Sequence, residues 1–381
     1  MSVILKNIGG DRTLWAIIAL LAIFSFLPVY SASSNLANLY GRSTFTLLLK
    51  HVVHLVLGFG IIYGIHKIKY QRFKGLSIVL LPIVIILLGV TLMQGTTIGG
   101  ANASRWIRVP VVGFSFQTST LAAVVLMVYV ARYLAKFKDK TIVFKESFIE
   151  LWIPVGAVLI LILPANFSTA ALIFSMVMVV VFIGGYPLKF MGLIVGAGLT
   201  LLLLFVLTAK AFPDAFNNRV ETWQNRIENF SNGEDTKEDY QIERAKTAIA
   251  SGRMFGLGPG KSVQKNFLPQ SSSDFIYAII VEEWGLLVGV VILLFYMLLL
   301  FRLIVILNKS ETTFGKLLVA GVGLPIIFQA LINMAVAVEL FPVTGQTLPL
   351  ISSGGTSIWM TCLAFGIILS VSSSQKEKQI N

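Results

Sequence analysis

The feature that most constrains the fold of this chain is a series of long apolar runs that recurs over nearly its whole length. Hydrophobic residues make up 56% of the sequence and charged residues only 13%. Several runs approach or exceed the roughly 20 residues that an α-helix needs to cross a bilayer. Because backbone polar groups find no water in lipid, such runs must be helical. The sequence therefore predicts one all-α polytopic membrane domain over residues 1–381.

Ten membrane-spanning helices account for the pattern. The first run, 14–31, is followed by small residues that resemble a signal-peptide cleavage site, but its length and the runs after it favour a retained span. The lone cysteine, Cys362, lies in an apolar run, so no intramolecular disulfide can form. The predicted spans are 14–31, 45–65, 76–94, 119–134, 149–164, 168–185, 188–211, 275–301, 314–338 and 354–373.

Alternate loops differ in positive charge, and the difference predicts an orientation. Lysine and arginine gather in 67–74, 132–145 and 302–316, whereas 339–353 has neither. Cytoplasmic loops of membrane proteins collect positive residues, so we expect both termini in the cytoplasm. The same rule explains the net charge of +12 without a nucleic-acid partner. The long polar segment 212–274 is then extracytoplasmic.

The polar segment 212–274 is the largest interruption of the apolar pattern. Residues 239–251 have an apolar and a charged face, which predicts a helix at the bilayer surface, and 216–230 have similar spacing. The glycine run 256–262 is a near-miss for a nucleotide phosphate loop, because Phe255 stands where the first glycine is required and no strand precedes it. We therefore expect a flexible turn or a backbone cradle for another phosphate, such as a lipid diphosphate.

Asp274 closes the polar segment where the next span is expected to begin. Aspartate is among the best helix N-caps, which is one interpretation. The other is a general base at the membrane surface. The two are compatible, because a helix N-terminus favours the ionised form that a base needs. None of the three histidines lies near Asp274 in the sequence, so no histidine triad or zinc site is predicted.

Glu282 and Glu283 lie further into the same predicted span. Carboxylates at that depth are costly, so they either serve a function or pair with a buried cation or hydroxyl. The polar residues of the second span, Lys50, His51 and His54, are the candidate partners.

Two further predicted outside segments carry polar residues beside apolar spans. In the first, Arg105 and Trp106 form either an interfacial aromatic belt with a flanking arginine or a grip on an anionic headgroup. In the second, 349–356, the glycines either allow tight helix packing or expose amides and hydroxyls to a substrate.

These segments together resemble one family more than any single motif does. The chain is similar to the SEDS family (shape, elongation, division and sporulation; FtsW/RodA type) over nearly its whole length, and closest to its division members. The motifs that carry the resemblance are Val29-Tyr30-Ser31-Ala32-Ser33, Ser104-Arg105-Trp106-Ile107, Gln117-x-Ser119, Tyr240-Gln241, Ala248-Ile249-Ala250-Ser251-Gly252, Gly256-x-Gly258-x-Gly260-x-Ser262-x-Gln264-Lys265, Phe267-Leu268-Pro269, Asp274-Phe275-Ile276-Tyr277-Ala278, Glu282-Glu283-x-Gly285, Gln329-x-x-Ile332-Asn333, Pro342-x-x-Gly345-x-x-Leu348-Pro349 and Ser352-x-Gly354-Gly355-Thr356-Ser357.

The resemblance implies a ten-span fold with cytoplasmic termini and peptidoglycan glycosyltransferase activity. Lipid II would be polymerised outside the membrane at the division septum, with inversion and loss of undecaprenyl diphosphate. Asp274 would be the general base on the acceptor 4-hydroxyl. The implied partners are a class B penicillin-binding transpeptidase and other divisome membrane proteins. Substrate-binding residues would be Arg105, Trp106, Gln117, Ser119, Lys246, Ser262, Gln264, Lys265, Ser352, Gly354, Gly355 and Thr356, supported by Glu282, Glu283 and Asn333.

The chain departs from the family pattern at three acidic positions. A glutamate and a lysine are replaced together by Thr120 and Ala123, an aspartate by Asn166, and a glutamate by Gln270. Loss of an ion pair as a pair leaves no orphan charge, so a compensated enzyme is expected. No cofactor is identified, and a divalent cation, Mg²⁺ or Mn²⁺, is the only candidate. A lipid II flippase and a noncatalytic scaffold for the transpeptidase stay open as alternatives.

Overall fold

The computed structural model describes residues 9–39, 41, 43–94, 106–109, 114–137, 142–211, 237–268 and 270–380. Within these ranges the regular elements are helices and one two-stranded antiparallel ribbon. The elements are α2 (Arg12–Phe24), α3 (Phe26–Leu39), α4 (Thr44–Ile65), α5 (Arg72–Gln94), β1 (Trp106–Val109), β2 (Phe114–Gln117), α6 (Thr118–Lys136), α7 (Phe144–Ser147), the π-helical turn η1 (Phe148–Trp152), α8 (Ile153–Ile162), α9 (Phe167–Ile183), α10 (Leu188–Ala211), α12 (Lys237–Gly252), the 3₁₀ turn η3 (Gln264–Asn266), α13 (Ile276–Lys309), α14 (Thr313–Ala337) and α15 (Thr356–Ile380).

Each of the ten predicted spans corresponds to a helical segment, so the predicted membrane fold is confirmed. Eight segments in the described part of the chain are long and apolar enough to cross a bilayer. The closely joined predicted pair 149–164 and 168–185 is the run α7–η1–α8 followed by α9, whose 17 residues are short for a span. The predicted surface helix 239–251 is α12, whereas 216–230 lies outside the described residues.

The first span is two helices that meet at Ser25. Its hydroxyl donates to the Ala22 carbonyl at 2.6 Å, a local bond that competes with the regular helical pattern. Asp11 caps α2 by accepting from Leu14 N at 2.9 Å. The backbone stays helical through Ser25, whose N–H donates to the Leu21 carbonyl at 3.1 Å, so α2 and α3 together form the predicted first span.

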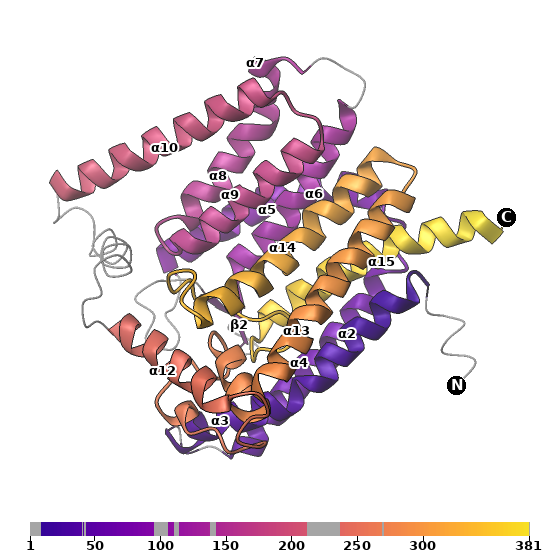
Figure 1. Cartoon of the computed structure of the whole chain (residues 1–381). Coiled ribbons are helices and arrows are strands. Elements are labelled where there is room, and N and C mark those ends of the chain that lie inside the picture. Colours follow the sequence, from indigo (N-terminus) through magenta and orange to yellow (C-terminus); the bar gives the residue numbers. More distant parts are fainter. Residues whose placement is uncertain are drawn as a thin grey trace.

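Both described chain ends lie at one end of the bundle, and α12 lies at the other (Figure 1). Asp11, just before α2, forms an ion pair with Arg302 near the end of α13. Tyr70 and Thr312, in two connections between helices, are hydrogen-bonded at 2.9 Å. The lysine- and arginine-rich loops thus share an end with the termini, as the charge pattern predicts. Which side of the membrane this is stays a prediction.

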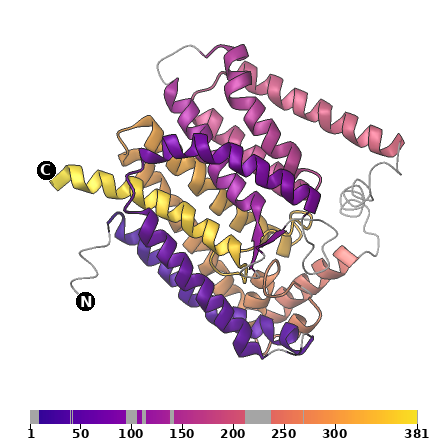
Figure 2. The same cartoon turned by 180° about the vertical axis from the view of Figure 1, so that it is seen from behind.

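The core forms around α14, which packs against α6, α9, α13 and α15. Viewed from behind (Figure 2), α15 runs along α4. Gly58 permits this approach, since a Cβ there would lie 2.6 Å from Cys362 Sγ. By contrast, α10 crosses at the edge (Figure 1), and its most apolar stretch has no buried residue. Its leucines are therefore placed to face lipid.

Candidate active site

The helix that follows Asp274 is broken at Gly285, which has φ 82° and ψ 171°. The break leaves carbonyls and amides of α13 without helical partners, and the predicted glycine run supplies them. Leu257 N and Gly258 N donate to the carbonyls of Glu282 and Glu283, both at 2.9 Å. A side chain at Gly256 would overlap the Glu283 carbonyl. Helix packing therefore explains the glycine run, and two amides that a phosphate would use are occupied.

Glu282 is completely enclosed by the turn after the glycine run. Its carboxylate accepts from Ser262 Oγ, from Val263 N at 3.0 Å and from Gln264 N at 3.3 Å. The side chain is 1% exposed. A buried carboxylate is tolerated where such donors surround it, so Glu282 fixes this turn to α13.

Glu283 is equally buried and ties α3 to the same turn. It accepts from Ser31 Oγ of α3 and from Ser262 N at 3.3 Å. Lys265 Nζ donates to Ser31 Oγ at 3.1 Å, so the Ser31 hydroxyl links this cation to the Glu283 carboxylate. The interpretation of the pair as structural is supported, and the partners are hydroxyls and amides.

The prediction that Lys50, His51 and His54 are the partners of Glu282 and Glu283 is wrong. His51 Nε2 is hydrogen-bonded to Ser25 Oγ at 2.8 Å, and His54 Nδ1 donates to the Lys50 carbonyl at 2.5 Å. The His54 ring lies 5.6 Å from that of Trp359. These side chains therefore join α4 to α2 and α15, because the helix order in space differs from the order of polar residues along the chain.

Asp274 is held in place by hydrogen bonds of its backbone. Its N–H donates to the Gln270 carbonyl at 3.1 Å, and its carbonyl accepts from Asn333 Nδ2 at 2.7 Å. Phe275, not Asp274, is the N-cap of α13, which corrects the capping interpretation. The carboxylate is partly buried and faces Gly345, where a Cβ would lie 3.5 Å from Oδ2.

The segment that precedes α15 docks onto the residues around Asp274. Asn333 Nδ2 donates also to the Gln346 carbonyl at 2.7 Å, so one amide joins Asp274 to that segment. Ser352 Oγ donates to the Ser273 carbonyl at 2.6 Å. Thr356 Oγ1 accepts from Gln117 N at 3.3 Å. The structure thus brings together five of the predicted site residues, Asp274, Asn333, Ser352, Thr356 and Gln117.

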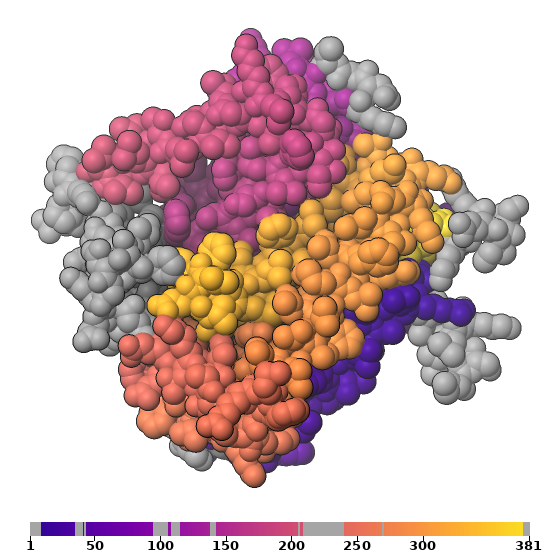
Figure 3. All heavy atoms as spheres, viewed as in Figure 1, coloured from indigo at the N-terminus to yellow at the C-terminus, as the bar shows by residue number. Residues whose placement is uncertain are grey.

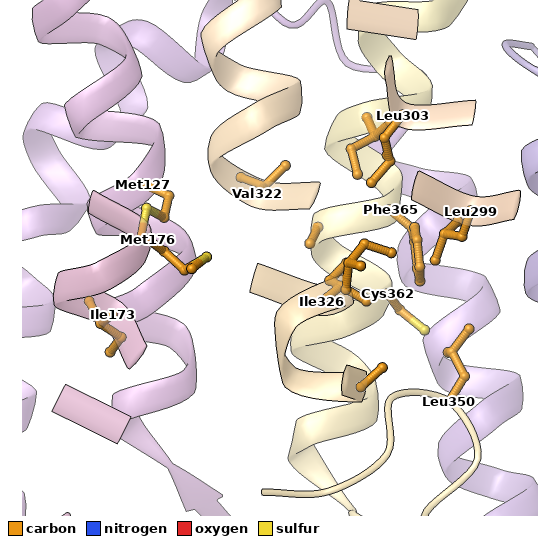
Figure 4. Close-up of a cluster of buried hydrophobic side chains, with 14 of the residues drawn as sticks. Met127, Ile173, Met176, Leu299, Leu303, Val322, Ile326, Leu350, Cys362 and Phe365 are labelled. Atoms are coloured by element: carbon orange, nitrogen blue, oxygen red, sulfur yellow. The ribbon is translucent and has the colours of Figure 1, made fainter. Parts of the chain in front are cut away.

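A partly open cavity lies between α6, α9, α14 and α15. Figure 4 shows part of its apolar wall, with Met127, Ile173 and Met176 across from Val322 and Ile326. Polar groups that also line it are Ser119, Thr120, Thr169, Gln329, Gln346, Ser357 and Thr361.

Two neighbouring residues of one loop lie near the cavity and near Asp274, respectively. Gln346 lines the cavity, and its Nε2 donates to Thr169 Oγ1 at 3.0 Å. The preceding residue, Gly345, lies against the Asp274 carboxylate. A smaller cavity shares Ser119 with the first.

The remaining predicted residues lie at several places. Trp106 pairs with Gln117 across the β1–β2 ribbon. Gln117 Nε2 donates to Ser119 Oγ at 3.2 Å. Lys246, on α12, forms an exposed 2.5 Å ion pair with Glu339, and hydrogen bonding to that carboxylate raises the pKa of Lys246. Gly354 and Gly355 precede α15, while Arg105 lies outside the described residues.

Sequence reasoning missed three side-chain roles at this site. Ser31, Thr169 and Gln346 were not singled out individually, although Ser31 and a loop around Gln346 fall in the family motifs. A polar residue inside an apolar run is the available signal, because it must find a partner. Among the described residues, no group of three histidine, cysteine or acidic side chains is placed to hold a metal.

Comparisons with known proteins agree with this architecture. The family model described as "Cell cycle protein", for FtsW, RodA and SpoVE, matches residues 11–377. The chain belongs to this family. A relative from Geobacter sulfurreducens named "Probable peptidoglycan glycosyltransferase FtsW" is 32% identical, with 93% of each chain covered. One of the same name from Hydrogenovibrio crunogenus is 32% identical, covering 94% of this chain and 90% of the relative.

Solved structures of the FtsW/RodA/SpoVE family have the same fold. The crystal structure of the Thermus thermophilus rod shape determining protein RodA matches with TM-score 0.67 and 26% identity, covering 96% of this chain and 97% of the other. A chain from a peptidoglycan synthase complex matches with TM-score 0.74 and 26% identity, covering 96% and 98%. The predicted family and multi-pass membrane fold are confirmed, and the predicted enzyme class agrees with the relatives' names.

The four residues at which the chain departs from the family pattern each have an identifiable position in the fold. Thr120 and Ala123 line the large cavity, and both side chains are uncharged. Asn166 caps α9 by accepting from Thr169 N at 3.2 Å. Gln270 Oε1 accepts from Ser273 Oγ at 2.7 Å in the turn before Asp274.

Proposed function

We propose that the chain is a peptidoglycan glycosyltransferase that polymerises lipid II on the outer face of the cytoplasmic membrane during cell division. Family membership and the names of the relatives support the reaction class. The observation that carries the assignment of the site is the position of Asp274. This residue is fixed by its backbone against the loop that also lines the cavity.

In the proposed reaction, Asp274 removes the proton from the 4-hydroxyl of the acceptor's GlcNAc. The oxygen then attacks C1 of the donor's MurNAc with inversion, and the bond to undecaprenyl diphosphate breaks. The proton stays on Asp274 until it passes to solvent, and the diphosphate leaves with the bonding electrons. A base needs an ionised carboxylate within reach of the hydroxyl. The three neutral replacements fit a mechanism with one essential acid.

The diphosphate of the donor requires cationic or hydroxyl groups near Asp274. Arg105 and Lys265 are the proposed anchors, and the hydroxyls and amides of Ser352–Thr356 and Ser119 are the proposed polar lining. Arg105→Ala and Lys265→Ala should then raise the lipid II concentration needed for half-maximal rate more than they lower the thermal unfolding midpoint. Unchanged activity across a lipid II titration would remove this assignment.

The proposed partner is a class B penicillin-binding transpeptidase at the division septum, with both termini of the chain in the cytoplasm. A structural neighbour comes from a complex that coordinates polymerization and crosslinking, which supports a synthase partnership. Depletion of the protein should give filamentous cells, whereas rounding would indicate an elongation role. A divalent cation is tested by removing metal with a chelator and restoring Mg²⁺ or Mn²⁺.

The deciding experiment supplies lipid II to the purified protein with its transpeptidase in proteoliposomes. The wild type should form glycan strands, and Asp274→Asn should form almost none while remaining folded. Gln270→Ala, in the same turn, is the matched control and should keep most of the activity. Translocation of lipid II without polymer would favour a flippase, and normal polymer from Asp274→Asn would refute its role as base.

A further inference from the structure

The segment 253–267, which follows α12 and includes η3, exposes large apolar side chains at the end of the bundle that holds α12. Phe255 is 82% exposed, and Met254, Leu257, Val263 and Phe267 are all more than 40% exposed. Figure 3 shows this part of the chain on the molecular surface. A cluster of exposed apolar residues of this kind marks a contact with a membrane or a protein.

The charge of the same loop is entirely positive. Residues 250–268 contain Arg253, Lys261 and Lys265 and no acidic residue. Arg253 and Lys261 are exposed, while Lys265 is directed to Ser31 Oγ and the Gly260 carbonyl. Apolar side chains interleaved with cations suit the boundary between acyl chains and anionic headgroups.

The position of the loop along α13 places it at that boundary. Leu286 N donates to the Arg253 carbonyl at 2.8 Å, and Leu287 N to the Met254 carbonyl at 3.4 Å. Leu286 and Leu287 are exposed and begin the apolar stretch of α13 that runs to the opposite end of the bundle. The exposed loop side chains are therefore continuous with a surface that faces lipid.

Figure 3 also shows that this surface adjoins the N-terminal helices, and Ser31 of α3 is bonded to Lys265 in the same loop. Hydrogen bonds from Ser262 and the following amides to Glu282 hold the loop rigidly. Because the loop is rigidly joined to α13, its depth in the membrane would also fix the depth of the start of α13, next to Asp274.

We propose that residues 253–267 insert into the extracytoplasmic leaflet as a lipid-binding lip, with Phe255 and Met254 among acyl chains and Lys261 on anionic headgroups. This contact sets the depth of the Asp274 turn relative to lipid headgroups. It concerns bulk bilayer lipid and does not depend on which glycolipid the enzyme polymerises.

The test is a spin label at Phe255→Cys in a Cys362→Ala background, with the full chain in nanodiscs of phosphatidylcholine alone or with phosphatidylglycerol. Collision rates with oxygen and with a water-soluble nickel complex report depth. Val290→Cys, on the lipid-facing side of α13, is the deep control, and Glu243→Cys, on the charged face of α12, is the aqueous control.

We expect the label at residue 255 to resemble the Val290 control, with oxygen collisions exceeding nickel collisions several-fold. Lys261→Glu should reduce this ratio in phosphatidylglycerol and leave it unchanged in phosphatidylcholine alone. A label as accessible to nickel as the Glu243 control would overturn the proposal. Protection that arises only when the transpeptidase is added would overturn it too, in favour of a protein-binding surface. An equal effect of Lys261→Glu in both lipids would remove the headgroup contact.

Discussion

Asp274 and the pair Glu282 and Glu283 lie within ten residues of each other in the sequence but differ in burial and in how they are held. Glu282 and Glu283 are buried, and hydroxyls and backbone amides donate to them. Asp274 is partly buried and is positioned by bonds to its own N–H and carbonyl. A carboxylate whose oxygens are used by the fold is poorly suited to accept a proton from substrate. The main-chain bonds that position Asp274 do not depend on its carboxylate.

Replacing the acid on each side of this comparison should separate activity from stability. Asp274→Asn removes the proposed base while leaving both backbone hydrogen bonds, so polymerisation should fall by about 10²–10⁴-fold with an unchanged unfolding midpoint. Glycan product on gels and thermal unfolding in detergent measure the two effects. A large fall in the midpoint would show that Asp274 is also structural.

Glu282→Ala should have the reverse profile. It would leave Ser262 Oγ and two amides unsatisfied in a buried turn, which costs about 3 kcal/mol or more. We expect a lower unfolding midpoint and reduced yield in membranes. Glu282→Gln keeps one acceptor oxygen and should be milder. Full stability of the alanine variant would contradict the structural assignment of this carboxylate.

The uncharged cavity provides a third test of the effect of burial on charge. Ala123→Lys would place an unpaired cation among apolar side chains and should destabilise the protein by about 3 kcal/mol. The double change Thr120→Glu with Ala123→Lys supplies an opposite charge one helical turn away and should recover part of the loss. Unfolding midpoints of both variants decide this. Equal midpoints would show that the pair does not form.

Asn333 should influence activity only by holding the backbone of Asp274 in position. Asn333→Leu removes the two donated hydrogen bonds that hold the Asp274 and Gln346 carbonyls, so the polymerisation rate should fall about tenfold. Gln329→Leu is the control, because its amide holds Thr347 instead. If both variants lose the same activity, the effect is not specific to the Asp274 turn.

The smallest effect is expected at Lys246, whose ion pair with Glu339 is exposed to solvent. Its pKa is raised in the folded protein. The pair therefore stabilises the fold below the ordinary lysine pKa of 10.5, and this contribution is lost as pH rises through the raised value. Lys246→Met should lower the unfolding midpoint slightly at pH 8 and not at all in strong base. A large loss of activity instead would support a role in substrate binding.

Much of the fold was predictable because each span is a local property. A run of apolar residues must become a helix in lipid whatever its neighbours are, so ten spans and the surface helix α12 could be located from the sequence. The positions of helix ends were less accurate. Asp274 is not the N-cap, because the turn before it is closed by bonds to the Gln270 carbonyl.

Partner choice could not be predicted, because it depends on which helices are neighbours in space. The histidines of α4 were expected to meet Glu282 and Glu283, yet they face α2 and α15. The glycine run was expected to turn freely or hold phosphate, yet two of its positions support the break at Gly285.

The sequence by itself determined that this is a helical membrane protein with one long polar segment that ends at Asp274. Hydropathy and the order of motifs can be read without knowing which helices are neighbours in space. Only the tertiary structure decided the roles of its three neighbouring carboxylates. Ser31, Ser262, Asn333 and Gly345 come from distant parts of the chain. Their packing buries two acids among hydroxyl and amide donors and places Asp274 against the loop that holds Gly345.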